Sequence, residues 1–298
     1  MGSSDVAPPT APAWLVPAST VCLAMGINFW LIAYVLMVRR SLATNATPAP
    51  LLALGLNLAW EVVYAFGVCE APIETFGFTL WLLLDIPVLY ATLKTAPRSF
   101  ATSPLIARNV PLLLFIIFVA GMIGNGMFVW WWLKEPHRGY GIKWGKTWKG
   151  LEARDTTELA FWSAGVAQMI FSVAALAMLL QRGHSGGAEL CNLFLFAACL
   201  VLSKTGSTVL YCRLRVRFCR FVGTVMGLPV TCVLLWWYWP EAHGFVFHPL
   251  GIFFIGTSVF CDLLYPFLLA HVRMTEKILP DGTVVAGDVV VETEKKQQ

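Results

Sequence analysis

Three carboxylic acids lie inside stretches of the sequence that are otherwise apolar enough to be buried in a membrane: Glu61, Asp85 and Asp262. No Lys, Arg or His lies deep in any of the well-defined apolar stretches to pair with them. Burial away from water favours the neutral form of a carboxyl group, so we expect at least one of the three to be protonated at neutral pH. A water-shielded, protonated carboxyl group bonded to a second carboxyl group is a Brønsted acid ready for proton transfer.

Glu61 belongs to a polar face within its own apolar stretch. Asn57, Glu61 and Tyr64 are spaced i, i+4 and i+7, which places them on one side of an α-helix. An ionisable side chain at bilayer depth costs roughly 2.5 kcal/mol or more, so by default it marks a functional site. Glu61 is therefore our first candidate for a catalytic acid, Asp262 is the second and its expected partner, and Asp85 is the third.

Aromatic side chains accompany the acids. Trp30, Trp60 and Trp81 lie in the middle of apolar stretches, and the π face of each can stabilise a cation by roughly 0.5–2 kcal/mol. Acids and aromatic walls together predict protonation of an apolar substrate and sheltering of a carbocation. The tyrosines that could complete the wall are Tyr34, Tyr64, Tyr90 and Tyr265. The supporting polar residues that we expect are Asn28, Asn57, Tyr64 and Tyr265.

A structural role is the alternative for each of these polar side chains. A buried carboxyl or amide group can bond a neighbouring helix and hold the bundle together. For Asp85 this alternative weighs as much as the catalytic one, because Pro87 follows closely and breaks a helical hydrogen bond that a polar side chain can replace. For the amides of Asn28 and Asn57 it is the favoured interpretation.

The composition places the chain among polytopic membrane proteins. Its 298 residues are 58% hydrophobic and 13% charged, which excludes a soluble globule of this length. The net charge of +4 comes from basic residues in short loops, so it indicates membrane topology and not a nucleic-acid partner. The eight cysteines include no CxxC pair and no Cys/His cluster, so neither a disulfide framework nor a metal site is expected.

Seven apolar runs are long enough for transmembrane helices, which need about 20 residues. They cover 18–38, 50–68, 75–93, 111–133, 159–180, 218–239 and 249–271. An eighth run, 190–211, contains Lys204 and is assigned to a cytoplasmic surface or re-entrant helix, because seven spans leave most Lys and Arg on the cytoplasmic side. The prediction is an all-α bundle of seven transmembrane helices, with the N-terminus lumenal and the C-terminus cytosolic.

The expected domain organisation follows from these runs. Residues 1–17 form a flexible tail, residues 18–273 the membrane domain, and residues 274–298 a disordered tail rich in charge. The loop 134–158 is rich in Lys and Trp although it lies on the outer side. We expect either an interfacial cap anchored by Trp144 and Trp148 or a mobile loop.

The chain resembles a family in four motifs: Trp60-Glu61-x-x-Tyr64 with Asn57 before it, Trp81-x-x-x-Asp85, the turn Arg182-Gly-His-Ser, and Asp262-x-x-Tyr265. The family is that of the integral-membrane terpene cyclases of fungal meroterpenoid and indole-diterpene pathways, of the paspaline-cyclase and pyripyropene-cyclase type. The resemblance runs from about Asn28 to Arg273. It is interrupted near 190–215 and in the long loop 134–158.

This resemblance implies a seven-helix enzyme of the endoplasmic reticulum that cyclises a prenylated aromatic or polyketide whose terminal alkene has been epoxidised. It assigns protonation of the epoxide, which starts a cationic cascade, to Glu61 and Asp262; a terminal alkene is the alternative proton acceptor. The reaction is a non-redox isomerisation or lyase-like step without a cofactor, since no diphosphate leaves. The expected partners are the hydrophobic epoxyprenyl substrate, the lipid bilayer, and a prenyltransferase and an epoxidase of the same pathway.

Other classes of protein would also place acids in a membrane. A proton-coupled small-molecule transporter needs mid-membrane carboxylates, but the sequence shows no inverted repeat or paired broken helices. A retinal protein would need a lysine for a Schiff base, and the last span has none. The sequence leaves open the substrate, the prenyl length, the ring pattern of the product, the acid that donates the proton and the oligomeric state. It also leaves open whether 190–211 spans the membrane or is an insertion artefact of the gene sequence.

Overall fold

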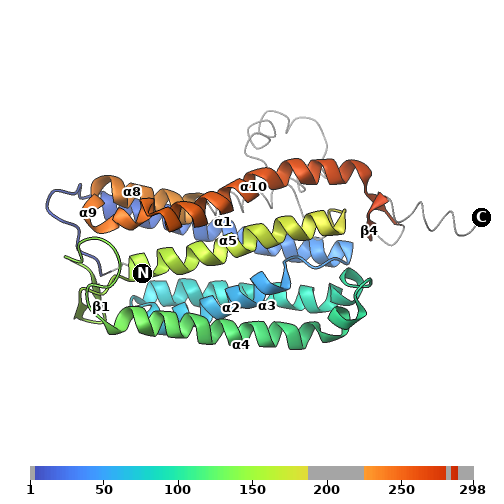
Figure 1. Cartoon of the computed structure of the whole chain (residues 1–298), viewed down its shortest axis with the longest axis horizontal. Coiled ribbons are helices and arrows are strands. Elements are labelled where there is room, and N and C mark those ends of the chain that lie inside the picture. The colour runs from blue at the N-terminus through green and yellow to red at the C-terminus, as the bar shows by residue number, and fades with distance from the viewer. Residues whose placement is uncertain (1–3, 187–224, 280–282, 288–298) are drawn as a thin grey trace, which may run out of the picture.

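The computed structural model describes residues 4–186, 225–279 and 283–287, and they form a bundle of long helices that lie side by side (Figure 1). Six helices of this described part are long and apolar enough to cross a membrane: α1 (Leu15–Thr44), α2 (Leu51–Val63) with its π-helical continuation η1 (Tyr64–Val68), α3 (Pro72–Ser99), α4 (Pro104–Lys134), α5 (Thr156–Arg182) and α10 (Pro249–Thr275). The π-helical stretch η2 (Met226–Val230) and α8 (Thr231–Tyr238) pack against α1. The fold is an all-α membrane bundle, as predicted.

The observed helices extend beyond the apolar runs from which they were predicted. The run 18–38 lies within α1, for example, and the run 111–133 lies within α4. Hydropathy marks the part of a helix that suits the hydrocarbon core, whereas the helix itself continues into the interface. Of the predicted run 218–239, the described residues 225–238 are helical, and the doubtful run 190–211 lies outside the described residues.

Helices α5 and α10 run parallel to each other. Gly165 lies against Phe254 near their beginnings, and Tyr265 packs with Ala175 and Leu179 farther along both helices. The two helices accordingly end at the same end of the bundle (Figure 1). This is the arrangement expected with seven spans, because a single crossing then separates the two helices.

Small residues allow α2 and α4 to pack closely. A Cβ atom on Gly121 would come within 2.8 Å of the Ala59 Cβ atom, and one on Gly55 would come within 2.6 Å of the Ile117 side chain. Such approaches of helix backbones are typical of membrane bundles, where van der Waals packing drives association. This packing fixes the position of α2, which carries Glu61.

The N-terminal segment, predicted as a flexible tail over 1–17, makes hydrogen bonds to distant parts of the chain through its described residues. The Val6 N–H donates to the Gly145 carbonyl at 2.8 Å, and the Asp5 carboxylate accepts from Lys146 Nζ at 2.5 Å and Thr157 Oγ1 at 2.9 Å. Helix α1 also begins within this segment, at Leu15. These contacts could not be predicted from the sequence, because the residues that bond to Asp5 and Val6 lie far away along the chain.

The other predicted tail, 274–298, is ordered in part. The Glu276 carboxylate accepts a hydrogen bond from Ser185 Oγ at 2.8 Å. Beyond it β3 (Lys277–Ile278) pairs with β4 (Val284–Val285) in an antiparallel hairpin. The predicted tail thus contains paired strands among its described residues, and residues 288–298 lie outside them.

The loop 135–155 forms an ordered structure that we call the outer cap. It contains the two short antiparallel strands β1 (Thr147–Trp148) and β2 (Leu151–Glu152). The Trp148 indole N–H donates to the carbonyl of Val68 at 2.9 Å, whereas Trp144 is exposed. Of the two alternatives predicted for this loop, the structure favours a cap, and Trp148 anchors it to the protein.

A buried group of charges, the cap ion network, ties the outer cap to the N-terminal segment and to the start of α5. It consists of Asp5, Lys143, Lys146, Asp155 and Glu158. Lys143 Nζ lies 3.1 Å from Asp155 Oδ2 and 2.5 Å from Glu158 Oε2, and Lys146 Nζ lies 2.5 Å from Asp5 Oδ2. Burial acts to raise the pKa of Asp155, but Lys146 and Lys143 together hold that pKa below its usual value. The two lysines are thus paired and not free to bind anions.

His243 joins this network from the short helix α9 (Pro240–His243). Its Nδ1 lies 3.0 Å from the Trp239 carbonyl oxygen and its Nε2 lies 3.3 Å from Lys146 Nζ. The carbonyl can only accept, so Nδ1 carries the hydrogen and Nε2 accepts from the lysine. Burial and the charge of Lys146 lower the pKa of His243 to about 3.

Acidification from pH 7 to pH 5 should destabilise the fold by about 2 kcal/mol through His243 alone. The unfolded chain binds a proton on this histidine below its ordinary pKa of 6.5, and the folded chain does so only near 3. The unfolded state therefore holds more protons throughout this window, and stability falls as the pH falls. Denaturant unfolding at both pH values, with His243→Gln as the comparison, measures the effect. An equal pH dependence in wild type and variant would contradict it.

Candidate functional site

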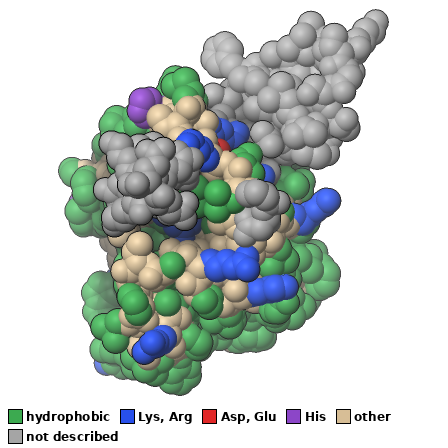
Figure 2. Space-filling view, turned by 90° about the vertical axis from the view of Figure 1, so that its right-hand side faces the viewer, with side chains coloured by type: hydrophobic (Ala, Val, Ile, Leu, Met, Phe, Trp, Pro, Cys, Tyr) green, Lys and Arg blue, Asp and Glu red, His purple; other side chains and the backbone are tan. Residues whose placement is uncertain are grey.

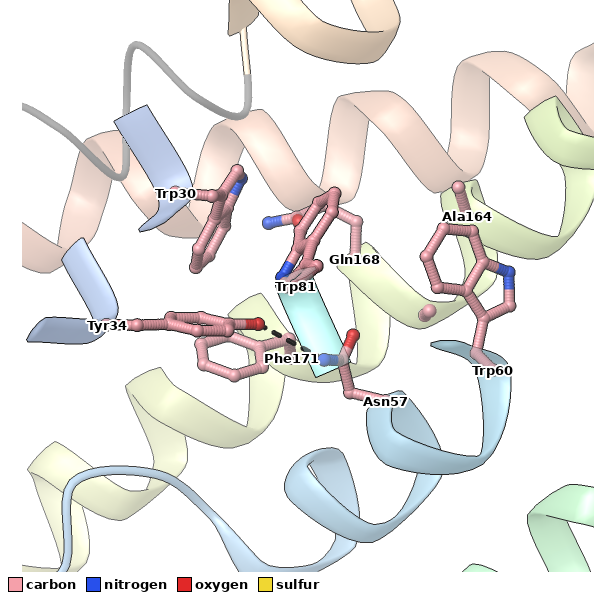
Figure 3. Close-up of a pocket in the computed structure, with 9 residues that line it drawn as sticks. Trp30, Tyr34, Asn57, Trp60, Trp81, Ala164, Gln168 and Phe171 are labelled. Carbon is pink, nitrogen blue, oxygen red and sulfur yellow. Dashed lines mark hydrogen bonds between the residues drawn. The ribbon is translucent and has the colours of Figure 1, made fainter. Parts of the chain in front are cut away.

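The three predicted tryptophans line one cavity between α1, α2, α3 and α5 (Figure 3). The cavity has a volume of about 70 Å³. Its lining residues are Trp30 and Tyr34 from α1, Asn57 and Trp60 from α2, Trp81 from α3, and Ala164, Ala167, Gln168 and Phe171 from α5. Most of this wall is aromatic or aliphatic carbon, which suits an apolar ligand. Stabilisation of a cation by these rings stays a prediction.

Glu61 and Asp85 meet at the Asn57 side chain, and we call these two acids the acid pair. Asn57 Nδ2 lies 2.6 Å from Glu61 Oε1, 3.0 Å from Asp85 Oδ2 and 3.1 Å from the Tyr34 hydroxyl oxygen. Both acids are buried, at 0% and 1% exposure. Asn57 thus connects the acid pair to the wall of the cavity.

Helix geometry explains how these groups converge. Asn57 and Glu61 are one turn apart on α2, as the sequence predicts, and Trp81 and Asp85 are one turn apart on α3. Residues four apart share a face of a helix. Because the short link at 69–71 makes α2 and α3 neighbours, their two polar faces can turn toward each other.

The chemistry of the acid pair follows from its surroundings. Among the described residues no Lys, Arg or His forms an ion pair with Glu61 or Asp85. The Asn57 amide has only two hydrogens, so it cannot donate to all three of its neighbouring oxygens. Two adjacent carboxylates in an apolar site repel each other, and a shared proton removes that repulsion. The arrangement can therefore hold one acidic proton beside an apolar cavity.

The structure places Asp85 beside Glu61, whereas the predicted partnership between Glu61 and Asp262 stays a prediction. Asp262 is buried on α10, a helix that packs mainly against α5, and it does not line the cavity. Tyr265, one turn later, belongs to a separate apolar cluster with Leu179. Sequence alone could not rank these acids, because all three lie mid-span. A catalytic role for Asp262 stays a prediction.

Phe171 separates these two regions. Its ring packs against the apolar cluster that contains Trp30 and Tyr34, and also against the cluster that contains Tyr265. It also lines the cavity. Phe171 therefore lies between the cavity and the cluster on α10.

Two residues that the sequence suggested for the site lie outside this cavity. Asn28, expected as a supporting amide, is exposed on α1, and its amide donates to the Ala24 carbonyl of the same helix at 2.8 Å. Tyr90, expected as a possible wall residue, is likewise exposed, at 55%, on α3. The period of the helix turns each side chain outward, and a role for either residue stays a prediction.

Tyr64 supports the site without lining it. Its ring stacks on Trp60 with centroids 4.7 Å apart, and its hydroxyl oxygen lies 2.5 Å from Ser163 Oγ. The Trp60 indole N–H donates to the same Ser163 oxygen at 3.0 Å. Ser163, which sequence reasoning missed, therefore fixes the orientation of Trp60 from α5. A single serine in an apolar helix gives no sequence signal for this role.

The sequence model of the Pyr4-like transmembrane terpene cyclases matches residues 3–191 and 214–275 of this chain. The unmatched stretch between them coincides with the region near 190–215 where the sequence departs from the cyclases that it resembles. Most of the chain, including all three acids, lies within the matched residues.

Curated relatives give the same result over nearly the whole length. Terpene cyclase ascF of Acremonium egyptiacum is 30% identical over 275 residues, which cover 92% of this chain and 89% of the relative. Terpene cyclase dpchB of Colletotrichum higginsianum is 31% identical, with 88% and 89% covered, and terpene cyclase dpfgB of Gibberella zeae is 32% identical, with 89% of each covered. No solved structure gives a significant match. The chain belongs to the family of Pyr4-like transmembrane terpene cyclases.

Proposed function

We propose that this protein is a terpene cyclase that protonates the epoxide of a hydrophobic epoxyprenyl substrate and so starts a cationic cyclisation. The observation that carries the proposal is the acid pair, bridged by Asn57 at the wall of an aromatic cavity. The substrate class is a prenylated aromatic or polyketide with an epoxide at the end of its prenyl chain. The mechanism follows from the groups around that cavity.

The first step is proton transfer from the acid pair to the epoxide oxygen. The O–H bond of the carboxylic acid breaks, the C–O bond to the more substituted epoxide carbon breaks, and the oxygen becomes a hydroxyl group. The carboxylate that remains keeps its hydrogen bond from Asn57. General acid catalysis of this kind contributes typically 10²- to 10⁴-fold.

The aromatic wall then acts on the cation. Successive alkenes of the prenyl chain attack the cationic carbon, and each attack forms one C–C bond and moves the positive charge along the chain. Trp30, Trp60 and Trp81 line the cavity, and the π face of a tryptophan stabilises a cation by roughly 0.5–2 kcal/mol. Loss of a proton from the last cation, to a weak base or to water at the mouth of the site, ends the reaction. Substrate and product are isomers, so the balanced reaction needs no cofactor.

The substrate requires more room than the cavity offers at rest. Ligand sites for molecules of this size enclose about 300–1,000 Å³, and this cavity has about 70 Å³. The most economical widening is rotation of Phe171, which lies between the cavity and the cluster around Tyr265. That movement would bring the α10 side, with Asp262, within reach of a long substrate.

We place the N-terminus in the lumen of the endoplasmic reticulum and the C-terminus in the cytosol. Lys and Arg side chains gather at the end of the bundle where α5 and α10 terminate (Figure 2), and Arg98, Arg182 and Arg273 lie in the last turns of their helices. Positive residues favour the cytosolic side. The cap lysines at the other end, Lys143 and Lys146, are buried in ion pairs, which supports this orientation because their charge is neutralised within the protein.

Membranes that contain the protein should convert an epoxyfarnesyl or epoxygeranylgeranyl aromatic into a product of the same mass and a different retention time. The test is mass spectrometry after incubation with a panel of such substrates. Non-epoxidised prenyl analogues and membranes without the protein serve as controls. A prenyltransferase and an epoxidase are the enzymes that would have to supply this substrate. Failure to isomerise any member of the panel, by correctly inserted protein, would contradict the proposal.

A further inference from the structure

Trp81 carries a buried indole N–H that has no hydrogen-bond partner among the described residues. Other indoles of the bundle are bonded: Trp60 to Ser163 at 3.0 Å, Trp132 to the Asp155 carbonyl at 3.0 Å, and Trp162 to Glu158 at 3.0 Å. Buried polar groups are normally paired, because an unpaired one forfeits its bonds to water without compensation. The orphaned donor of Trp81 therefore calls for a partner that is not part of the protein.

The position of Trp81 suggests what that partner is. The side chain lines the cavity, and Figure 3 shows the indole nitrogen on the side of the ring that faces Tyr34 and Asn57. Asp85 lies one helical turn farther along the same face of α3. The Tyr34 hydroxyl lies close enough to the indole N–H to interact with it, but no hydrogen bond of normal geometry joins the two. The Trp81 indole N–H and the acid pair thus lie near the same part of the cavity wall.

Two oxygens of the acid pair receive no hydrogen bond from another residue. Glu61 Oε2 and Asp85 Oδ1 are buried, and no donor group among the described residues bonds to them, so the proton that the acid pair holds is the only one available to them. That proton and the indole N–H together fit a small group that can take one proton and accept one further hydrogen bond. An epoxide oxygen has two lone pairs and meets this requirement, whereas an alkene does not.

We propose that Trp81 is a catalytic residue whose indole N–H donates a hydrogen bond to the epoxide oxygen while the acid pair protonates the same oxygen. This inference rests on the proposed function and deepens it. Electron density moves onto the oxygen as the C–O bond breaks, so a fixed donor stabilises the transition state more than the bound substrate. The indole N–H is already desolvated and positioned, and it needs no rearrangement at the moment of reaction.

The same contact would select epoxides over alkenes. A site with a buried donor discriminates against an analogue that lacks the matching acceptor, because the donor then stays unpaired. The aromatic face of Trp81 remains available to the cation in either case. Loss of the N–H should therefore impair the epoxide substrate specifically and leave the apolar contacts of the ring in place.

Two replacements of Trp81 test the donor. In Trp81→Phe, and in a variant with β-(3-benzothienyl)alanine at this position, an aromatic ring is kept and the N–H is lost. Both should lower kcat/KM for the epoxide substrate by about 10- to 100-fold, while Trp130→Phe, at an exposed position on α4, should leave it unchanged. The benzothienyl variant preserves the volume of the ring, so it remains informative if Trp81→Phe does not insert. Wild-type kcat/KM in the benzothienyl variant would overturn the inference.

A pair of inhibitors separates donation from packing. A prenyl dimethylamine N-oxide presents an oxygen that accepts hydrogen bonds, and a prenyl trimethylammonium ion presents only the cation. The benzothienyl variant should weaken binding of the N-oxide by about tenfold and change binding of the ammonium ion less than twofold. Equal effects on both ligands would show that Trp81 acts only through its ring. If wild-type protein converts no epoxide, the proposed function fails, and the ligand pair still reports whether the indole donates.

Discussion

Glu61→Gln should lower the rate of cyclisation by about 10²- to 10⁴-fold, the usual contribution of a general acid. Glutamine keeps an oxygen that can accept the 2.6 Å hydrogen bond from Asn57, so the helix bundle should insert and fold as before. It has no acidic proton to give to the epoxide. The measurement is the initial rate of product formation, by mass spectrometry, in membranes with equal amounts of protein.

A matched control is Glu152→Gln, which makes the same chemical change at an exposed position of β2. It should retain the wild-type rate. If Glu61→Gln cyclised the substrate at the same rate as Glu152→Gln, the acid pair would have no role in the mechanism.

The variants Asp85→Asn and Asp262→Asn distinguish the two possible partners of Glu61. If Asp85 is the partner, its replacement should slow the reaction about as much as Glu61→Gln. The double variant should then be no slower than either single one, because residues that act as a unit show non-additive effects. A large loss with Asp262→Asn and a small loss with Asp85→Asn would instead support the pairing predicted from the sequence.

The sequence predicted the helical class and the face of α2, because both depend on local patterns. Hydropathy located the spans, and the spacing of Asn57 and Glu61 placed them on one face. It did not predict that this face meets Asp85, because that depends on how α2 is packed. Close contacts such as that of Gly121 with Ala59 set the packing, and a glycine in an apolar run carries no information about its neighbour.

The other residues of the cavity wall could not be predicted from the sequence for a related reason. Ala164, Ala167 and Phe171 line the cavity from α5, yet in the sequence they look like any other residues of an apolar span. Tyr34 was recognised as a wall residue, but its contact with Asn57 was not. Such roles arise from shape, and one sequence without an alignment does not encode shape at the level of single side chains.

Lys146→Met should destabilise the fold by about 3–5 kcal/mol, the usual effect of removing one partner from a buried ion pair. Lys146 is fully buried and contacts Asp5, Asp155 and His243. Its loss leaves the Asp5 carboxylate without its counter-charge, and Asp155 with Lys143 alone, in a site that water does not reach. Denaturant unfolding of the detergent-solubilised protein measures the change.

Lys149→Met is the matched control, because Lys149 is exposed and lies over the Trp148 ring. It should change stability by less than about 1 kcal/mol, as is usual for a surface charge. A comparably small effect of Lys146→Met would contradict a structural role for the cap ion network. Asp155, the N-cap residue of α5, belongs to that network, and α5 supplies half of the cavity wall. Near the unfolding midpoint Lys146→Met should therefore reduce the fraction of active protein, while kcat per folded molecule stays at the wild-type value.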